Sequence, residues 1–293
     1  MASTLKYAIH IHVEGECAGP RRIVDFAREA EDAGWDGVFV TDHLAARGAP
    51  GSLPVADPWI ALAAVAAATQ RVRIGPMVAA LPRYRPWQLA SAAATLDQLC
   101  GGRLVLGVGL GTRDELNFAA FGEERDARTR GRMLDEALAV LGGLWGGEPF
   151  SFAGDFYQVE HATCLPRPLQ APRIPVWVAG TWPHRRPFRR AARWDGCFAD
   201  VEGVDWLAGA IMAPDDLRAI VAYTRDQRQQ HGDAGSPFDV VIGGRLPDDL
   251  ARAAATLAPY ADAGLTWWVE GMLDAFGSPE QLRHRIGRGP PRG

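Results

Sequence analysis

Histidines near the ends of two predicted strands are the residues of this chain best suited to move a proton. His10 and His12 are two apart in an alternating segment, 5–13, and His43 follows a second apolar run as the last residue of Thr41-Asp42-His43. Histidine titrates near neutral pH, so it can act as a general acid or base or donate a hydrogen bond to a bound group. A structural histidine that caps a loop is the alternative for His43.

The pair His10 and His12 also has the spacing seen in metal-dependent barrel hydrolases. Such sites need further histidines and a carboxylate from later strands. Here the later strand ends offer Gly180, Asp200 and Glu270, and the other histidines lie in a predicted insertion or in helices. We therefore predict no metal site and place His12 in the lining of a polar substrate pocket.

A glycine-rich strand, 103–111, offers a second chemical feature. Gly107, Gly109 and Gly111 are two apart, so they lie on one side of an extended backbone. A planar cofactor can lie flat against such a backbone, and a barrel strand that needs small residues for packing is the alternative. The dinucleotide fingerprint is not met, because Thr112 follows and no helix opens directly.

A basic loop, 180–187, has the composition of an anion site. Backbone amides at a helix N-terminus, a hydroxyl and nearby guanidiniums suit the phosphate of a mononucleotide. Arg128 and Arg130 precede another predicted helix and are placed to assist. A solvated arginine-rich helix face is the alternative. We predict that Trp182, in the same loop, lines the mouth of the pocket.

The elements that must position these residues alternate along the chain. Strands are predicted at 5–13, 37–44, 72–81, 103–111, 175–180, 196–200, 238–243 and 266–270. Helices are predicted at 20–35, from 58 onward, and at 86–99, 132–145, 188–194, 214–231, 248–263 and 278–286. Eight strand–helix pairs favour a single α/β domain over 1–293, a (β/α)8 TIM barrel with its site at the C-terminal strand ends; a doubly wound sheet is the competitor.

Three segments depart from this alternation. Residues 147–174 are predicted to be an insertion, in which 150–159 alternates around Ala-Gly-Asp as a β-hairpin does. The Gly/Pro-rich segment 45–55 is predicted to be a long loop, and the tail from Gly287 is predicted to be loose.

Charge and cysteine content exclude several classes of protein. The 293 residues carry 31 basic and 35 acidic side chains, for a net charge of −4, so we expect neither nucleic acid nor a membrane surface as the main partner. The four cysteines have no metal or redox spacing, which favours a reduced, cytoplasmic setting. The start of the chain has no signal-peptide pattern, and the most apolar stretch, 60–69, is too short to span a bilayer.

Short pieces of the sequence, taken in order, resemble the luciferase-like flavin-dependent monooxygenases. This family of (β/α)8 barrels includes bacterial luciferase and the oxidoreductases that use the deazaflavin F420. The resemblance extends from the first strand to the last helix. Its pieces are EAEDAGWDG at 29–37, TDH at 41–43, LDQL at 96–99, GRLVLGVGLG at 102–111, FG at 121–122, LDEAL at 134–138, FAGDFY at 152–157, PRPLQ at 166–170, PVWVAG at 175–180 and AARWDG at 191–196.

The resemblance implies a reduced flavin or F420 across the barrel mouth. It implies that His43 is catalytic and lies near the reacting atoms, and that Met77-Val78 forms a ring-supporting bulge that often carries a non-proline cis peptide. The cofactor-binding residues it implies are Met77, Val78, Gly109, Leu110, Gly111, Arg128, Ala179, Gly180 and Thr181. The predicted substrate pocket adds His12, Asp42 and Trp182.

The expected function is therefore a monooxygenase that uses reduced FMN from a partner reductase, together with O2, on a small organic substrate. Hydride transfer to or from F420 is the first alternative. A metal-dependent hydrolase and a flavin-binding barrel without turnover are further alternatives. F420-dependent sugar-phosphate dehydrogenases of the family have an acidic residue soon after the glycine strand, where this chain has Thr112, which argues against that activity. The oligomeric state stays open, with a homodimer as the family's common form.

Overall fold

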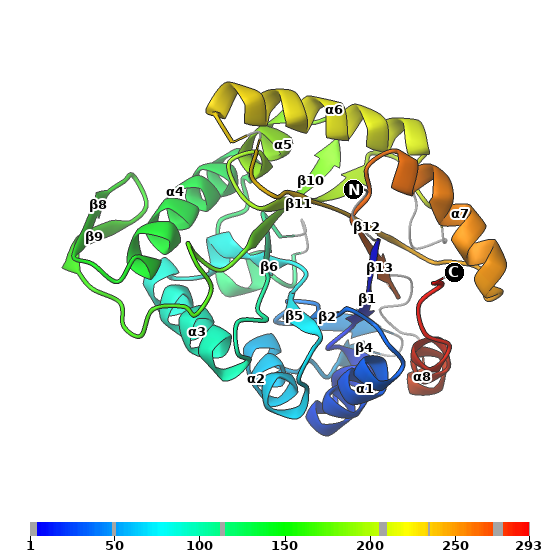
Figure 1. Ribbon diagram of the computed structural model, residues 1–293. Helices are drawn as coiled ribbons and strands as arrows, with labels where there is room; N and C mark the ends of the chain where they lie inside the picture. The colour runs from blue at the N-terminus through cyan, green and yellow to red at the C-terminus, as the bar shows by residue number, and fades with distance from the viewer. Residues whose placement is uncertain are drawn as a thin grey trace.

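The main sheet of the protein is a ring of parallel strands surrounded by helices (Figure 1). The computed structural model describes residues 5–48, 51–111, 115–204, 210–233, 235–271 and 278–292. The strands of the ring are, in sheet order, β5 (Arg73–Pro76), β2 (Gly37–Val40), β1 (Lys6–Ile11), β13 (Trp267–Glu270), β12 (Asp239–Gly244), β11 (Gly196–Val201), β10 (Val176–Trp182), β7 (Leu106–Gly109) and β6 (Ala79–Ala80).

The ring closes because β5 and β6 are two halves of one predicted strand, 72–81. A cis peptide between Met77 and Val78 separates them. β6 pairs with β7, and Ile74 of β5 bridges to Leu104, so the two ends of the sheet meet and the barrel closes there. On the opposite side β1 pairs with β13. The predicted (β/α)8 barrel is confirmed.

The helices start where the sequence provides caps. Asp57 accepts a hydrogen bond from the Ile60 amide, and Ser278 forms a capping box with Gln281; a proline follows each cap at the first helical position. Over the described residues the helices are α1 (Pro20–Asp32), α2 (Pro58–Ala68), α3 (Pro86–Leu99), α4 (Ala127–Trp145), α5 (Arg185–Ala191), α6 (Pro214–His231), α7 (Leu250–Asp262) and α8 (Pro279–Gly287), with short 3-10 helices η1 (Gly15–Ala18), η2 (Leu81–Arg83) and η3 (Ala119–Phe121). No described helix has the length and hydropathy that a membrane-spanning segment needs.

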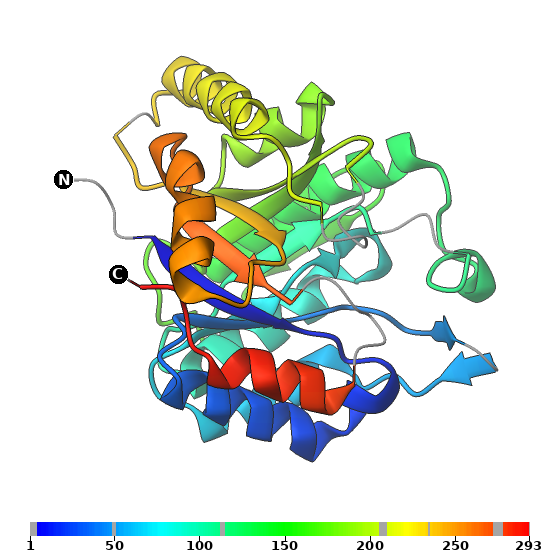
Figure 2. The same cartoon turned by 90° about the vertical axis from the view of Figure 1, so that its right-hand side faces the viewer.

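Two antiparallel pairs stand outside the ring. β3 (Ala46–Gly48) and β4 (Gly51–Leu53) pair where a loop was predicted, and Figure 2 shows them projecting away from the end at which both termini lie. β8 (Phe150–Ala153) and β9 (Gln158–Ala162) lie between α4 and β10 in the chain.

The tail after α8 is attached to the barrel, contrary to the prediction of a loose segment. The Tyr7 hydroxyl donates to the Pro291 carbonyl at 3.3 Å, and Arg292 pairs with Asp36 at 2.6 Å. These contacts hold the tail against the N-terminal ends of β1 and β2.

Strand alternation divides the core into an inner and an outer part. The inner core fills the barrel with aromatic rings: Trp177 lies 5.2 Å from Phe39 and 5.3 Å from Trp267 between ring centroids. The larger outer core lies between the strands and the helices. Residues that continue the inner face beyond these rings therefore reach the C-terminal mouth of the barrel.

Candidate active site

Inward-facing polar residues continue β1 beyond the aromatic core. Ala8 belongs to the inner core, so the alternation of the strand turns His10, His12 and Glu14 to the same side. All three are buried. By the same alternation Thr41 and His43 follow Phe39 of β2 on the inner face.

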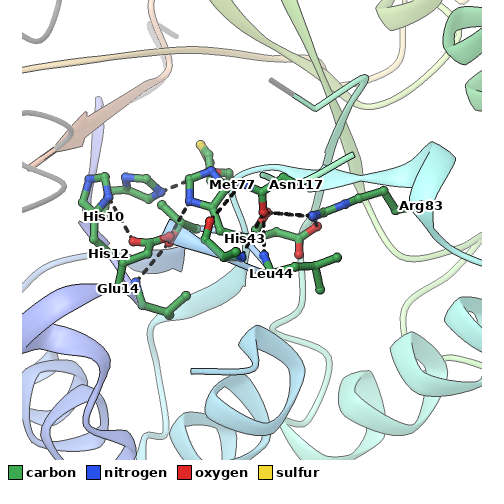
Figure 3. Close-up of polar contacts among 12 residues, drawn as sticks. His10, His12, Glu14, His43, Leu44, Met77, Arg83 and Asn117 are labelled. Carbon is green, nitrogen blue, oxygen red and sulfur yellow. Dashed lines mark hydrogen bonds and ion pairs between the residues drawn. The ribbon is translucent and has the colours of Figure 1, made fainter. Parts of the chain in front are cut away.

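Glu14 joins the two strands through its carboxylate (Figure 3). Its Oε1 accepts a hydrogen bond from the Thr41 hydroxyl at 2.7 Å and lies 2.5 Å from His43 Nδ1, and its Oε2 lies 3.4 Å from His12 Nδ1. Burial by itself raises the pKa of a carboxyl. Here the contacts with His12, His43 and Thr41 outweigh burial and hold the pKa of Glu14 well below its usual range.

His43 is the member of this cluster that reaches the mouth, with 31% of its side chain exposed. Burial lowers its pKa, but the hydrogen bond to Glu14 and the charges of Glu14 and Asp42 outweigh burial and the opposing charge of Arg83, so the pKa of His43 is raised. A carboxylate only accepts, so the proton on Nδ1 faces Glu14 and Nε2 is left to take or give a proton. This is the arrangement of a general acid–base pair.

The segment after His43 is held by a second set of contacts. The Asp42 carboxylate accepts from the Tyr84 hydroxyl at 2.9 Å and pairs with Arg83 at 2.9 Å. The Leu44 amide donates to Asn117 Oδ1 at 2.6 Å (Figure 3). Asp42 was predicted to line the substrate pocket. The structure instead buries its carboxylate among groups of the protein, where it fixes the backbone that carries His43.

Small and apolar groups form a floor beside the cluster. The cis-linked Met77 and Val78 lie at the break in the third barrel strand. A Cβ added to Gly109 would lie 2.9 Å from Val78 Cγ2 and 3.4 Å from Ala179 Cβ, so these three residues are in contact across neighbouring strands.

Gly107 of β7 and Gly111, just after this strand, allow neighbouring residues to pack closely against the backbone. A Cβ on Gly107 would lie 2.5 Å from the Pro76 carbonyl oxygen, and one on Gly111 would lie 2.5 Å from the Phe118 ring. The space that was assigned to a planar cofactor beside these two positions is therefore filled by neighbouring residues. The packing alternative explains them, and Thr112 lies outside the described residues.

Arg130 is the arginine of α4 that reaches the glycine strand. It is buried, its Nη1 donates to the Leu110 carbonyl at 3.1 Å, and its guanidinium lies 4.2 Å from the centre of the Phe118 ring. Arg128, which was the predicted phosphate ligand, is exposed. The structure thus favours Arg130 as the cation beside Leu110.

The predicted phosphate turn is divided between two faces of β10. Trp177 is in the inner core, so Ala179 and Thr181 face inward while Gly180 faces the helices. A Cβ on Gly180 would lie 2.6 Å from Pro187 Cβ, so a glycine is needed for α5 to approach the strand.

Trp182 also faces outward. Its ring centroid lies 5.7 Å from that of Phe188 and 5.9 Å from that of Tyr223, and the Arg185 guanidinium stacks on it at 5.1 Å. The indole therefore packs between β10 and the helices α5 and α6, and the prediction that it lines the pocket mouth is wrong.

Glu14 was missed from the sequence, although a signal was present. His10, His12 and Glu14 are spaced by two, so the alternation that placed the two histidines inside the barrel extends to the carboxylate.

Among the described residues, no group of three or more His, Cys, Asp or Glu side chains is placed to hold a metal ion.

Comparisons with known proteins agree with this architecture. Residues 4–266 match the family model described as luciferase-like monooxygenase. Curated relatives are the F420-dependent glucose-6-phosphate dehydrogenases of Microbacterium testaceum, 39% identical over 168 residues, and Beutenbergia cavernae, 41% identical over 172 residues. Each match covers 56% of this chain and 48% of the relative, so the chain spans about half the length of the curated relatives it matches.

Solved structures share the fold over nearly the whole chain. An F420-dependent secondary alcohol dehydrogenase, in complex with an F420-acetone adduct, has a TM-score of 0.78 at 18% identity and 99% coverage of both chains. The coenzyme F420-dependent tetrahydromethanopterin reductase of Methanopyrus kandleri has a TM-score of 0.74 at 16% identity, covering 98% of this chain and 99% of its own. A monooxygenase of Streptomyces bottropensis has a TM-score of 0.74 at 21% identity and 97% coverage of both.

Proposed function

The chain belongs to the luciferase-like monooxygenase family, and from this premise we propose that it is an F420-dependent oxidoreductase that oxidises an alcohol. The curated relatives support F420, because those quoted above are F420-dependent dehydrogenases. This reverses the order expected from the sequence, in which reduced FMN with O2 came first and F420 second.

The Glu14–His43 pair is the observation that carries the proposal. Oxidation of an alcohol to a carbonyl compound releases a hydride from carbon and a proton from oxygen. His43 Nε2 would take the hydroxyl proton, and the Glu14 carboxylate, 2.5 Å from Nδ1, would stabilise the imidazolium that results. F420, when bound, supplies the hydride acceptor.

The residues beside this pair fit a flat, partly apolar ring with a charged tail. Val78, Gly109 and Ala179 have small side chains or none, and Gly109 lies against the other two. The Thr181 hydroxyl and the buried Arg130 supply a hydrogen-bonding group and a cation near its edge. These five residues would hold the cofactor.

The substrate is proposed to be a small organic alcohol. Sugar phosphates are the first compounds to test, since the curated relatives are named for glucose 6-phosphate. Thr112, where the family's sugar-phosphate dehydrogenases have an acidic residue, argues against them but not against F420. The flavin reductase and the homodimer remain predictions.

Equilibrium binding, followed by fluorescence, tests the cofactor directly. F420 and FMN, each oxidised and reduced, are titrated into the purified protein. We expect F420 to bind at least about tenfold more tightly than FMN, a difference of about 1.4 kcal/mol, and alcohol-dependent F420 reduction to proceed without O2. Binding of FMN alone, with substrate-dependent oxygen uptake, would restore the monooxygenase interpretation. If the protein bound neither cofactor, the proposal of a cofactor site at Val78, Gly109 and Ala179 would be wrong.

A further inference from the structure

A cavity of about 340 Å³ lies between the end of β1, where His10 and His12 line it, and α8. Its volume is within the range of roughly 300–1,000 Å³ that small-molecule sites occupy. The described residues that line it include His10 and His12 on one side and Arg245, Glu270 and Arg285 on the other.

The imidazole of His10 has one nitrogen, Nδ1, that can accept a hydrogen bond from a ligand. Its Nε2 lies 3.0 Å from the Met77 carbonyl oxygen, and a carbonyl only accepts, so Nε2 carries the proton. Burial, reinforced by the neighbouring His12, lowers the pKa of His10 to about 3, so the ring is neutral at ordinary pH. Nδ1 is therefore an acceptor, and it is buried with no hydrogen-bond partner among the described residues.

His12 presents a second acceptor. Its Nδ1 lies 3.4 Å from Glu14 Oε2, and the negative charge of the carboxylate favours a proton on that nitrogen. In the neutral ring Nε2 is then an acceptor, and it too is buried without a hydrogen-bond partner in the described structure. The two rings are close neighbours, with centroids 5.0 Å apart.

We propose that His10 and His12 form a subsite that selects a polyhydroxylated substrate. Each would accept a hydrogen bond from one substrate hydroxyl, while a further hydroxyl is oxidised beside His43. An apolar ligand would leave both nitrogens unpaired, and a ligand with only acceptors would set lone pair against lone pair. A site built to bond a hydroxyl rejects analogues that lack it by up to about 10⁴–10⁵-fold. Only the hydroxyl that is oxidised beside His43 depends on the proposed function; the binding of the other two hydroxyls by His10 and His12 does not.

The charges around the cavity are mostly paired within the protein. Arg285 lies 2.9 Å from Glu270 and 3.5 Å from Asp248. Arg245 is exposed and forms no ion pair with another described residue. The cavity therefore has a polar lining whose exposed charges include the Arg245 guanidinium and the Glu280 carboxylate. A sugar and a sugar phosphate share the polyol chemistry that the histidines recognise, and the test separates them.

Two substitutions remove the acceptors and keep the internal contacts. In His10→Gln the side-chain amide replaces Nε2 as donor to Met77, and in His12→Asn it replaces Nδ1 as donor to Glu14; neither places an acceptor where the imidazole had one. His231→Gln, at the exposed end of α6, is the matched control. Calorimetric titration with glucose and with glucose 6-phosphate needs no cofactor. F420 turnover then gives KM and kcat for both compounds and for propan-2-ol.

We expect the wild-type protein to bind at least one of the two hexoses, and each variant to bind it about tenfold more weakly, as loss of one hydrogen bond implies. KM for the hexose should rise by the same factor while kcat, and KM for propan-2-ol, stay within about threefold, less than the tenfold expected for one lost bond. A similar loss for both hexoses would identify the shared hydroxyls as the recognised group, and binding of glucose 6-phosphate alone would add its phosphate to the requirement.

Any of three results would overturn the subsite: the variants bind the hexose as tightly as the wild type, the variants raise KM for hexose and for propan-2-ol equally, or the wild type binds neither hexose. F420 binding is measured on the same samples. Hexose binding that depends on the two histidines in a protein that binds no F420 would support the subsite and refute the proposed function. F420-dependent oxidation of propan-2-ol by a protein that binds no hexose would support the proposed function and refute the subsite.

Discussion

Two buried glutamates on neighbouring strands have opposite surroundings. Glu14 follows β1 and faces into the barrel, where its partners are Thr41 and two histidines. Glu270 ends β13 and faces α8, where its partners are Arg285 at 2.9 Å and the Trp268 indole at 2.7 Å.

The difference lies in whether the partner can change its charge. Arginine keeps its proton at any ordinary pH, so the Glu270 contact is fixed, and burial raises the pKa of Glu270 despite that cation. Histidine exchanges a proton near neutrality, so the Glu14 contact can follow a reaction. Buried carboxylates with arginine partners therefore hold this barrel together, while the one with histidine partners is available for catalysis.

Removing the fixed contact should have the largest effect. Glu270→Gln leaves Arg285 with Asp248 as its remaining carboxylate, at 3.5 Å, and should lower the free energy of unfolding by about 3 kcal/mol, as loss of one partner of a buried ion pair does. Urea denaturation measures the change. Asp248→Asn, at an exposed carboxylate, is the control and should cost less than about 1 kcal/mol. Equal costs for the two variants would show that Glu270 is not a structural anchor.

His43→Ala should leave the fold intact and lower turnover. Loss of a positioned acid–base group costs about 10²-fold or more in kcat. Steady-state kinetics with F420 and the preferred alcohol measure it, and circular dichroism checks the fold. His184→Ala, at an exposed histidine, should change kcat by less than about twofold, well below that scale. Turnover that survives in His43→Ala would take His43 out of the mechanism.

Glu14→Gln tests whether the histidine partner tunes the reaction. The carboxylate raises the pKa of His43, so its removal should lower that pKa and move the acid-side inflection of kcat/KM to lower pH. Maximal turnover should fall by about tenfold, because the imidazolium loses its counter-charge. An inflection that stays in place would show that it does not belong to His43.

His10→Gln should make stability less sensitive to acid. The folded pKa of His10 is about 3 and its ordinary value is 6.5, so between these values only the unfolded chain binds the proton. The contribution of neutral His10 is complete above pH 6.5 and is lost as the pH falls toward 3. Unfolding experiments should show the wild type losing up to about 1.4 kcal/mol per pH unit relative to the variant below pH 6.5, and no difference in slope above it. Parallel pH profiles would contradict a buried neutral His10; His231→Gln should give such a parallel profile.

The sequence predicted regular elements well where local chemistry determines their ends. α3 and α6 have the predicted bounds, because Pro86 and Pro214 mark their first turns and Gly232, at a φ of 81°, ends α6. The β3–β4 pair was missed because two glycines and two prolines in 45–55 indicate a loop, whereas the pairing of β3 with β4 depends on the partner strand rather than on local preference.

The site was predicted less completely, because a residue's type does not tell which way it faces. Trp182 and Gly180 were assigned to the mouth by their position at a strand end, yet counting by two from Trp177 places both outside the barrel. The choice between Arg128 and Arg130 depends on the start of α4 at Ala127, which lies before the predicted start. The contact of Glu14 with His43 joins two strands and has no local signal.

The proposed acid–base pair and the proposed hydroxyl-binding histidines come from one short stretch of the chain. His10, His12, Glu14, Thr41 and His43 all belong to the first two strand–helix units, whereas the floor beside them is built from β5, β6, β7 and β10. A chimaera that exchanges residues 5–43 with the matching stretch of another barrel of this family would therefore transfer the acid–base chemistry and the hydroxyl selection as one block. The recipient would keep its own residues at the proposed cofactor floor, so its substrate would change while its cofactor site stayed the same.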